Sequence, residues 1–182
     1  MILPIATYGD ECLRKKSGPV ATVTPEIQSL ARDLLETMYH AEGVGLAAPQ
    51  VGRDVALCVI DVPAQSEKPD CREANASIPM PLVMVNPGVV PGAGTQRNNE
   101  GCLSFPEIHA MVTRPDTVSV TFTNLDNEPQ TLTARGLLAR AIQHEMDHLN
   151  GVLLVDRMSA LQKISVGGQL KKLVKASNNP CR

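Results

Sequence analysis

The segment His144 to His148, with the sequence HEMDH, places two histidines four positions apart in a stretch with helical periodicity. Side chains with this spacing lie on the same face of a helix, so the two imidazoles can bind one metal ion. Leu138, Ile142 and Met146 make a further side of this helix apolar, which is typical of a buried helix. Because an unpartnered buried polar group costs about 1–3 kcal/mol, two ordinary hydrogen-bonded histidines are the less favoured alternative. The chain is therefore predicted to fold around a central buried helix that carries metal-binding histidines.

A catalytic metal site commonly takes three protein ligands and leaves a fourth position open. No histidine follows His148, and Leu154 stands where an extended metalloprotease pattern would place the third one. The remaining soft ligand is cysteine, and Cys102 lies in a short segment flanked by glycine and proline. We therefore predict a site with two histidines and one cysteine. The alternative that stays open is a metalloendopeptidase with Asp156 as its third ligand.

The composition excludes several classes of protein. A length of 182 residues with 43% apolar content suits one compact domain, predicted to span residues 1–182. Aromatic residues make up 2%, tryptophan is absent and the net charge is -2, which argues against DNA or RNA binding. No apolar run approaches the roughly 20 residues that span a bilayer, and no signal peptide is visible. We expect a protein of the bacterial cytoplasm that does not bind membranes.

The cysteines support the same compartment. Their number is odd and their spacing irregular, which favours free thiols in a reducing environment over a disulfide framework. The five residues are Cys12, Cys58, Cys71, Cys102 and Cys181.

The pattern of apolar residues predicts an α+β fold, with antiparallel sheets packed around the central buried helix and a further helix near the C-terminus. The alternation of Val118, Val120 and Phe122 with polar residues indicates a strand that pairs with the next one as a hairpin. The predicted helices cover residues 24–43, 135–149 and 159–176, and the predicted strands cover residues 55–62, 81–85, 118–122 and 130–134.

Residues 63–79 form a polar stretch with three prolines, longer than most loops without secondary structure. A mobile surface insertion is the favoured interpretation. A lid over the substrate is the alternative.

Three segments resemble the signature motifs of peptide deformylases, in the order found in that family. They are GVGLAAPQ at Gly43 to Gln50, EGCLS at Glu100 to Ser104 and QHEMDH at Gln143 to His148. The resemblance implies a metal-dependent hydrolase that removes the formyl group from the N-terminal formyl-methionine of newly made proteins and releases formate. A catalytically silent metal-binding or ribosome-associated module of the same fold is the alternative.

The resemblance also implies a role for each motif residue. Cys102, His144 and His148 would bind the metal ion, and Glu145 would serve as catalytic acid and base. The Gln50 side chain and the Leu103 backbone N–H would stabilise the oxyanion.

Small residues suit the binding of a peptide. Gly43 and Gly45, with Val44 between them, allow a peptide backbone to approach closely, in the manner of an added strand. Leu137 and Ala141 lie on the same helix face as the first histidine, and we expect them to line a pocket for the methionine side chain.

Further features of the site follow from the resemblance. Glu100 is expected to be among the substrate-binding residues. It is also expected to pair with Arg114 and so to hold the EGCLS segment. Arg140 and His109 stand where related deformylases often carry an aliphatic residue and an arginine.

The resemblance implies one Fe²⁺ per chain, which Zn²⁺, Ni²⁺ or Co²⁺ can replace. The expected partners are nascent N-formylated polypeptides. The basic residues Lys171, Lys172 and Lys175 near the C-terminus predict a weak contact with the ribosome, although a solvated helix face is the common use of such a cluster.

Overall fold

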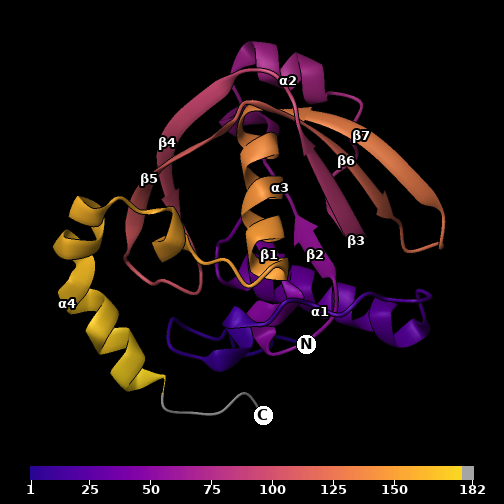
Figure 1. Ribbon diagram of the computed structural model, residues 1–182. Coiled ribbons are helices and arrows are strands. Elements are labelled where there is room, and N and C mark those ends of the chain that lie inside the picture. Colours follow the sequence, from indigo (N-terminus) through magenta and orange to yellow (C-terminus); the bar gives the residue numbers. More distant parts are fainter. Residues whose placement is uncertain (178–182) are drawn as a thin grey trace.

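The structure is a computed structural model that describes residues 1–177, and its centre is the helix α3 (Gly136–Leu149). Antiparallel strands lie on both sides of this helix (Figure 1). One sheet has five strands in the order β1-β2-β3-β6-β7, and the other consists of β4 and β5. The predicted α+β fold with a central buried helix is confirmed.

The five-stranded sheet forms the main core with α3. Val118 and Val120 of one strand are buried, as is Met84 of its neighbour, and they belong to the same apolar cluster as Leu138 and Ile142 of the helix. The polar residues between them face outward, as their alternation predicts. The strands are β1 (Gly45–Ala47), β2 (Leu57–Ile60), β3 (Leu82–Pro91), β6 (Thr117–Thr123) and β7 (Pro129–Arg135).

The smaller sheet was not predicted. Strand β4 (Thr95–Gly101) pairs with β5 (His109–Pro115) along its whole length. The sequence of β4 is TQRNNEG, which is polar and shows no apolar alternation, so only its pairing with β5 makes it a strand. As a consequence, Cys102 directly follows the end of a strand.

Two further helices cover the sheets. α1 (Pro25–His40) begins with a proline in its first turn, as predicted, and buries Leu34 and Met38. α4 (Ala160–Ala176) is the predicted C-terminal helix; Ser159 caps it and no residue of it is buried. Short 3₁₀ helices complete the chain: η1 (Glu11–Arg14), η2 (Ala48–Val51), η3 (Ala64–Ser66) and η4 (Leu154–Arg157).

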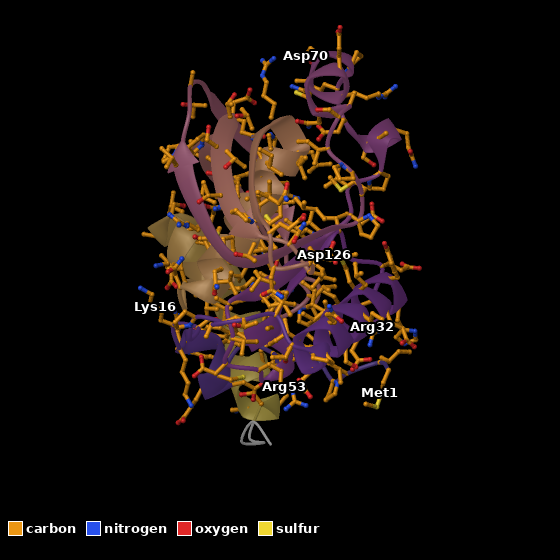
Figure 2. The ribbon with its side chains drawn as sticks, turned by 90° about the vertical axis from the view of Figure 1, so that its right-hand side faces the viewer. Met1, Lys16, Arg32, Arg53, Asp70 and Asp126 are labelled. Atoms are coloured by element: carbon orange, nitrogen blue, oxygen red, sulfur yellow. The ribbon has the colours of Figure 1, made fainter. Side chains whose placement is uncertain are left out.

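Residues 63–79 contain secondary structure, including α2 (Pro69–Asn75), and are attached to the central helix. The buried carboxylate of Glu67 accepts hydrogen bonds from the backbone N–H groups of Leu137 (3.1 Å) and Leu138 (2.9 Å). Figure 2 shows α2, marked by Asp70, at the opposite end of the molecule from Met1. The two hydrogen bonds to Glu67 mean that this segment caps the first turn of α3.

One prediction about the cysteines is wrong. Cys12 is disulfide-bonded. The prediction failed because the spacing of cysteines along a chain does not decide which sulfurs the fold brings together. Cys58, Cys71 and Cys102 are free, as predicted, and Cys181 lies outside the described residues. Within residues 1–177, no helix combines the length and the apolar character needed to cross a membrane.

Candidate metal centre and active site

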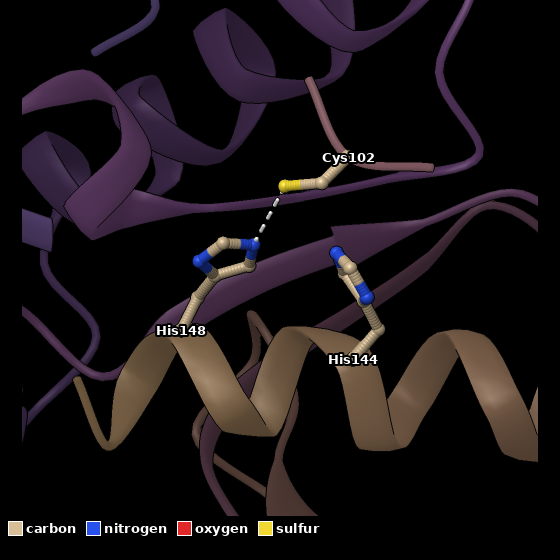
Figure 3. A group of neighbouring side chains, drawn as sticks. All are labelled: Cys102, His144 and His148. Atoms are coloured by element: carbon tan, nitrogen blue, oxygen red, sulfur yellow. Dashed lines mark hydrogen bonds between the residues drawn. The ribbon is translucent and has the colours of Figure 1, made fainter. Parts of the chain in front are cut away.

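Cys102, His144 and His148 lie together (Figure 3). Their ligand atoms are all within 4.8 Å of one another, and Cys102 Sγ is 3.2 Å from Nε2 of His148. The two histidines project from neighbouring turns of α3, with ring centroids 5.0 Å apart. Two ligand atoms that each lie about 2.0–2.3 Å from one ion are separated by roughly 3–4 Å. The donor set and its spacing therefore fit a single metal ion.

A buried ion pair orients His144. Its Nδ1 lies 3.2 Å from Oε2 of Glu100, and both oxygens of Glu100 accept hydrogen bonds from Arg114, at 2.7 and 2.8 Å. Although burial opposes ionisation, the hydrogen bonds from Arg114 and His144 lower the pKa of Glu100 to about 2. Arg114 also donates to Asp147 at 2.9 Å. The predicted pairing of Glu100 with Arg114 is confirmed, and it fixes the ring that carries a candidate ligand atom.

Glu145 is 3% exposed and lies on the pocket side of α3. Burial raises its pKa to about 7, although the charges of His144 and Arg114 oppose the shift. Among residues 1–177 its Oε2 has no hydrogen-bond partner. A Cβ atom at Gly45 would overlap Oε1 of Glu145, so an alanine here would push the carboxylate out of its present position.

Gln50 is buried beside Cys102. Its Oε1 accepts a hydrogen bond from the backbone N–H of Ala47 (2.8 Å), and its Nε2 donates to Oγ of Ser104 (3.1 Å). The same Nε2 lies 3.7 Å from Cys102 Sγ. These contacts orient the amide, so that its donor side faces the thiol.

A cavity of about 520 Å³ opens next to these residues. No residue of the 63–79 segment lines it, which does not favour the lid interpretation. The buried His148 is not part of its wall either. The wall contains all the residues predicted to bind substrate: Gly43, Val44, Gly45, Glu100, Leu137 and Ala141.

Several wall residues were missed by sequence reasoning. Asn99, Phe105 and Ile108 line the cavity from β4 and the turn that follows it. Their positions depend on the β4-β5 hairpin. β4 carries no alternation signal, but the buried Ile108, Ala110 and Val112 alternate with exposed residues and could have marked β5. Arg140 and His109, singled out as departures from related proteins, also line the cavity.

A sequence profile described as polypeptide deformylase matches residues 2–164. The chain belongs to the polypeptide deformylase family. The peptide deformylase of Salinibacter ruber is 41% identical over 176 residues, which cover 96% of this chain and 89% of that protein. The deformylase of Acinetobacter baumannii is 43% identical, over 96% of this chain and 93% of that one.

Solved deformylase structures have the same fold. A peptide deformylase from Synechococcus elongatus in complex with actinonin superposes with a TM-score of 0.80 at 38% identity, over 98% of this chain and 90% of that one. A deformylase from Legionella pneumophila gives a TM-score of 0.82 at 37% identity, over 99% of this chain and all of that one. The predicted function is confirmed: this deformylase is a hydrolase that removes the formyl group from nascent peptides.

The metalloendopeptidase alternative does not fit the structure. Asp156, its required third ligand, is bonded to Arg14 and accepts from the backbone N–H of Leu153 at 2.8 Å. It is not part of the cluster around Cys102.

Proposed function

We propose that this deformylase holds one Fe²⁺ through Cys102, His144 and His148, and that Zn²⁺, Ni²⁺ or Co²⁺ can take its place. The observation that carries the proposal is the thiol and two imidazoles gathered beside the buried Glu145. Glu100 is bonded to Nδ1 of His144, which leaves Nε2 for the metal. When bound, the ion acts as a Lewis acid and makes a nearby water more acidic. We further propose that residues 1–182 act as one catalytic domain.

Glu145 is proposed to move the proton. Its carboxylate accepts a proton from the attacking water and then donates it to the nitrogen of the departing amine. A carboxyl group with a pKa of about 7 suits both steps, because it is neither fully ionised nor fully protonated near neutral pH. Its unpartnered Oε2 is consistent with a group that binds water or substrate.

Gln50 and Leu103 are proposed to stabilise the oxyanion that forms on the formyl group. The donor side of Gln50 is already held beside Cys102 by the contact of its Oε1 with the backbone N–H of Ala47. Leu103 follows Cys102 directly, so its backbone N–H is carried by the same segment. Loss of one such donor typically reduces the rate by about 100- to 1000-fold.

The substrate peptide is proposed to bind along β1, with Gly43, Val44 and Gly45 at the cavity. β1 is an edge strand of the five-stranded sheet, and an edge strand offers backbone groups to an added peptide. Leu137 and Ala141 then contact the methionine side chain, and Glu100 supports the opposite wall.

The metal proposal is tested by loading the protein anaerobically with each ion and measuring formate release from a formyl-Met tripeptide. We expect the iron form to be the most active and to lose activity in air, because both Fe²⁺ and a cysteine ligand oxidise. Cys102→Ser is expected to lose most of its metal, with Cys71→Ser as the matched control that keeps it. Equal stability of the iron form in air and under anaerobic conditions would contradict an iron enzyme.

We also propose a bacterial cytoplasmic location and a weak contact between α4 and the ribosome. Lys171 and Lys172 are exposed on this helix, where ribosomal phosphates can reach them. Reversal of both charges to glutamate is expected to reduce co-sedimentation with ribosomes. Unchanged co-sedimentation would remove the ribosome contact from the proposal.

A further inference from the structure

Arg140 places a cation in the wall of the substrate cavity. The residue lies on α3 between Leu137 and Ala141, which line the proposed methionine pocket. It is itself a lining residue and only 7% exposed. A charged side chain is rarely buried to this extent without a partner of opposite charge.

The guanidinium group is only partly satisfied. Its Nη2 donates to Oε1 of Gln96 on β4, whose own amide group is held by the backbone oxygen of Gly136 at 2.8 Å. Its Nε is buried and has no hydrogen-bond partner within the part of the chain that the structure describes. Nε has almost no accessible surface, so a ligand cannot reach it. The donor left for another molecule is Nη1, which makes no hydrogen bond within the described residues and is not buried in this way.

No carboxylate is dedicated to Arg140. The closest acidic group is Glu100, whose Oε1 is 3.9 Å from Nη1 of Arg140. Glu100 already accepts two hydrogen bonds from Arg114 and faces His144. The wall of the pocket therefore carries a cation with more hydrogen-bond donors than its neighbours have free acceptors. A hydrocarbon side chain would be better suited by a purely apolar pocket.

We propose that Arg140 makes this pocket selective for a first residue whose side chain carries a hydrogen-bond acceptor. The thioether sulfur of methionine is a weak acceptor, the oxygen of methionine sulfoxide is a strong one, and a hydrocarbon has none. A pocket with an unpaired donor rejects a side chain that cannot accept from it. The inference rests on the proposed binding of methionine between Leu137 and Ala141, and it extends the substrates to peptides that begin with oxidised formyl-methionine.

The test compares three tripeptides that differ only in the first residue: methionine, methionine sulfoxide and norleucine. Their free-amine forms, which are products and are not turned over, are titrated into the metal-loaded full chain by calorimetry. We expect the sulfoxide to bind at least about 10-fold more tightly than norleucine, with methionine between them, because the hydrogen bond comes from a charged donor. Affinities within twofold of one another, or a preference for norleucine, would overturn the proposal.

Arg140→Met keeps an unbranched apolar stem and removes the donors, so it is expected to abolish the preference for the sulfoxide. Arg97→Met, an exposed position on β4, is the matched control and is expected to keep it. An unchanged preference in Arg140→Met would also overturn the proposal. If this variant does not fold, the three peptides on the parent protein decide alone.

Formate release from the formylated forms of the same peptides is measured in parallel. Absence of formate from all three would count against the proposed mechanism. The binding series would still decide the role of Arg140, because it requires no turnover.

Discussion

The helices α3 and α4 are of similar length, yet they are held in different ways. α3 is buried on most sides, and its charged and polar residues bond to groups from β4, β5 and η4. α4 has no buried residue, and the hydrogen bonds of its capping residue Ser159 are local. Figure 1 shows α3 between the sheets and α4 outside them.

The difference shows where a catalytic group can be built. A carboxylate with a pKa near 7 and a fixed imidazole both require low solvent access and partners that cannot move away. α3 meets these conditions through contacts with distant parts of the chain. α4 packs only half-buried side chains (Val166, Leu170 and Leu173) against the core and leaves the rest of its surface exposed, so it suits a surface role.

Arg114→Met should produce the largest loss of stability, because it removes the buried cation that pairs with both Glu100 and Asp147. Breaking a buried ion pair on one side costs about 3–5 kcal/mol of stability. We also expect less than one metal ion per chain, since His144 loses its orientation. Urea unfolding and metal analysis measure the two effects.

Arg157→Met is the matched control, because Arg157 bonds to the same Asp147 from the surface with its side chain 44% exposed. An exposed pair of this kind contributes about 1 kcal/mol or less. If both variants lost the same stability, the distinction between buried and exposed contacts of α3 would fail.

Gly45→Ala tests whether the position of Glu145, the proposed catalytic carboxylate, depends on β1. The added Cβ would displace Glu145, and a shift of about 1 Å in a catalytic group reduces the rate by roughly 100-fold. We expect kcat to fall while the metal content stays at the parent level. Gly88→Ala, on β3 away from the site, is the control and should retain activity; a fully active Gly45→Ala would show that the close packing is not needed.

Glu67→Ala separates the two ends of α3. Removal of the carboxylate leaves the first N–H groups of the helix without their acceptors, and the loss of a helix cap costs about 1–2 kcal/mol. Thermal unfolding would show the effect, with the exposed Glu73→Ala on α2 as control. Equal midpoints for the two variants would mean that residues 63–79 do not stabilise the helix.

Gly167→Ala should have the smallest effect, and it should be favourable. A Cβ at this position meets no atom within 4 Å, so the substitution changes only helix propensity. We expect a gain of about 0.5–1 kcal/mol in the stability of α4, visible as slower amide exchange. A loss of stability would mean that α4 packs against a partner surface.

The sequence predicted elements with strong periodicity well. The helices around Leu34 and His144 occur where the apolar spacing placed them, and the C-terminal helix forms as predicted although Gly167 and Gly168 lie in its middle. Strand β3 extends to Pro91, beyond the predicted end at residue 85, because the register shift after Val85 hides the continuation from the alternation pattern. Strand β4 has no apolar period at all, so neither it nor its pairing with β5 could be found.

The prediction of the site was limited in the same way, by contacts between residues that lie far apart in the sequence. The motifs indicated Cys102, His144 and Glu145, because two-histidine spacing and the need for a third ligand are visible along the chain. The capping of α3 by Glu67 joins residues about 70 positions apart, and nothing in a single sequence marks such a pair. The contact between Arg140 and Gln96 depends in the same way on the unpredicted strand β4.

The most direct test is formate release from a formyl-Met tripeptide by the anaerobically prepared iron form, beside Glu145→Ala with its metal content measured. We expect rapid release by the parent, near silence in Glu145→Ala at equal metal content, and parental activity in Glu73→Ala. Equal release by Glu145→Ala and the parent would contradict the role of Glu145. Tight metal binding without release by any of the three proteins would instead indicate a catalytically silent module.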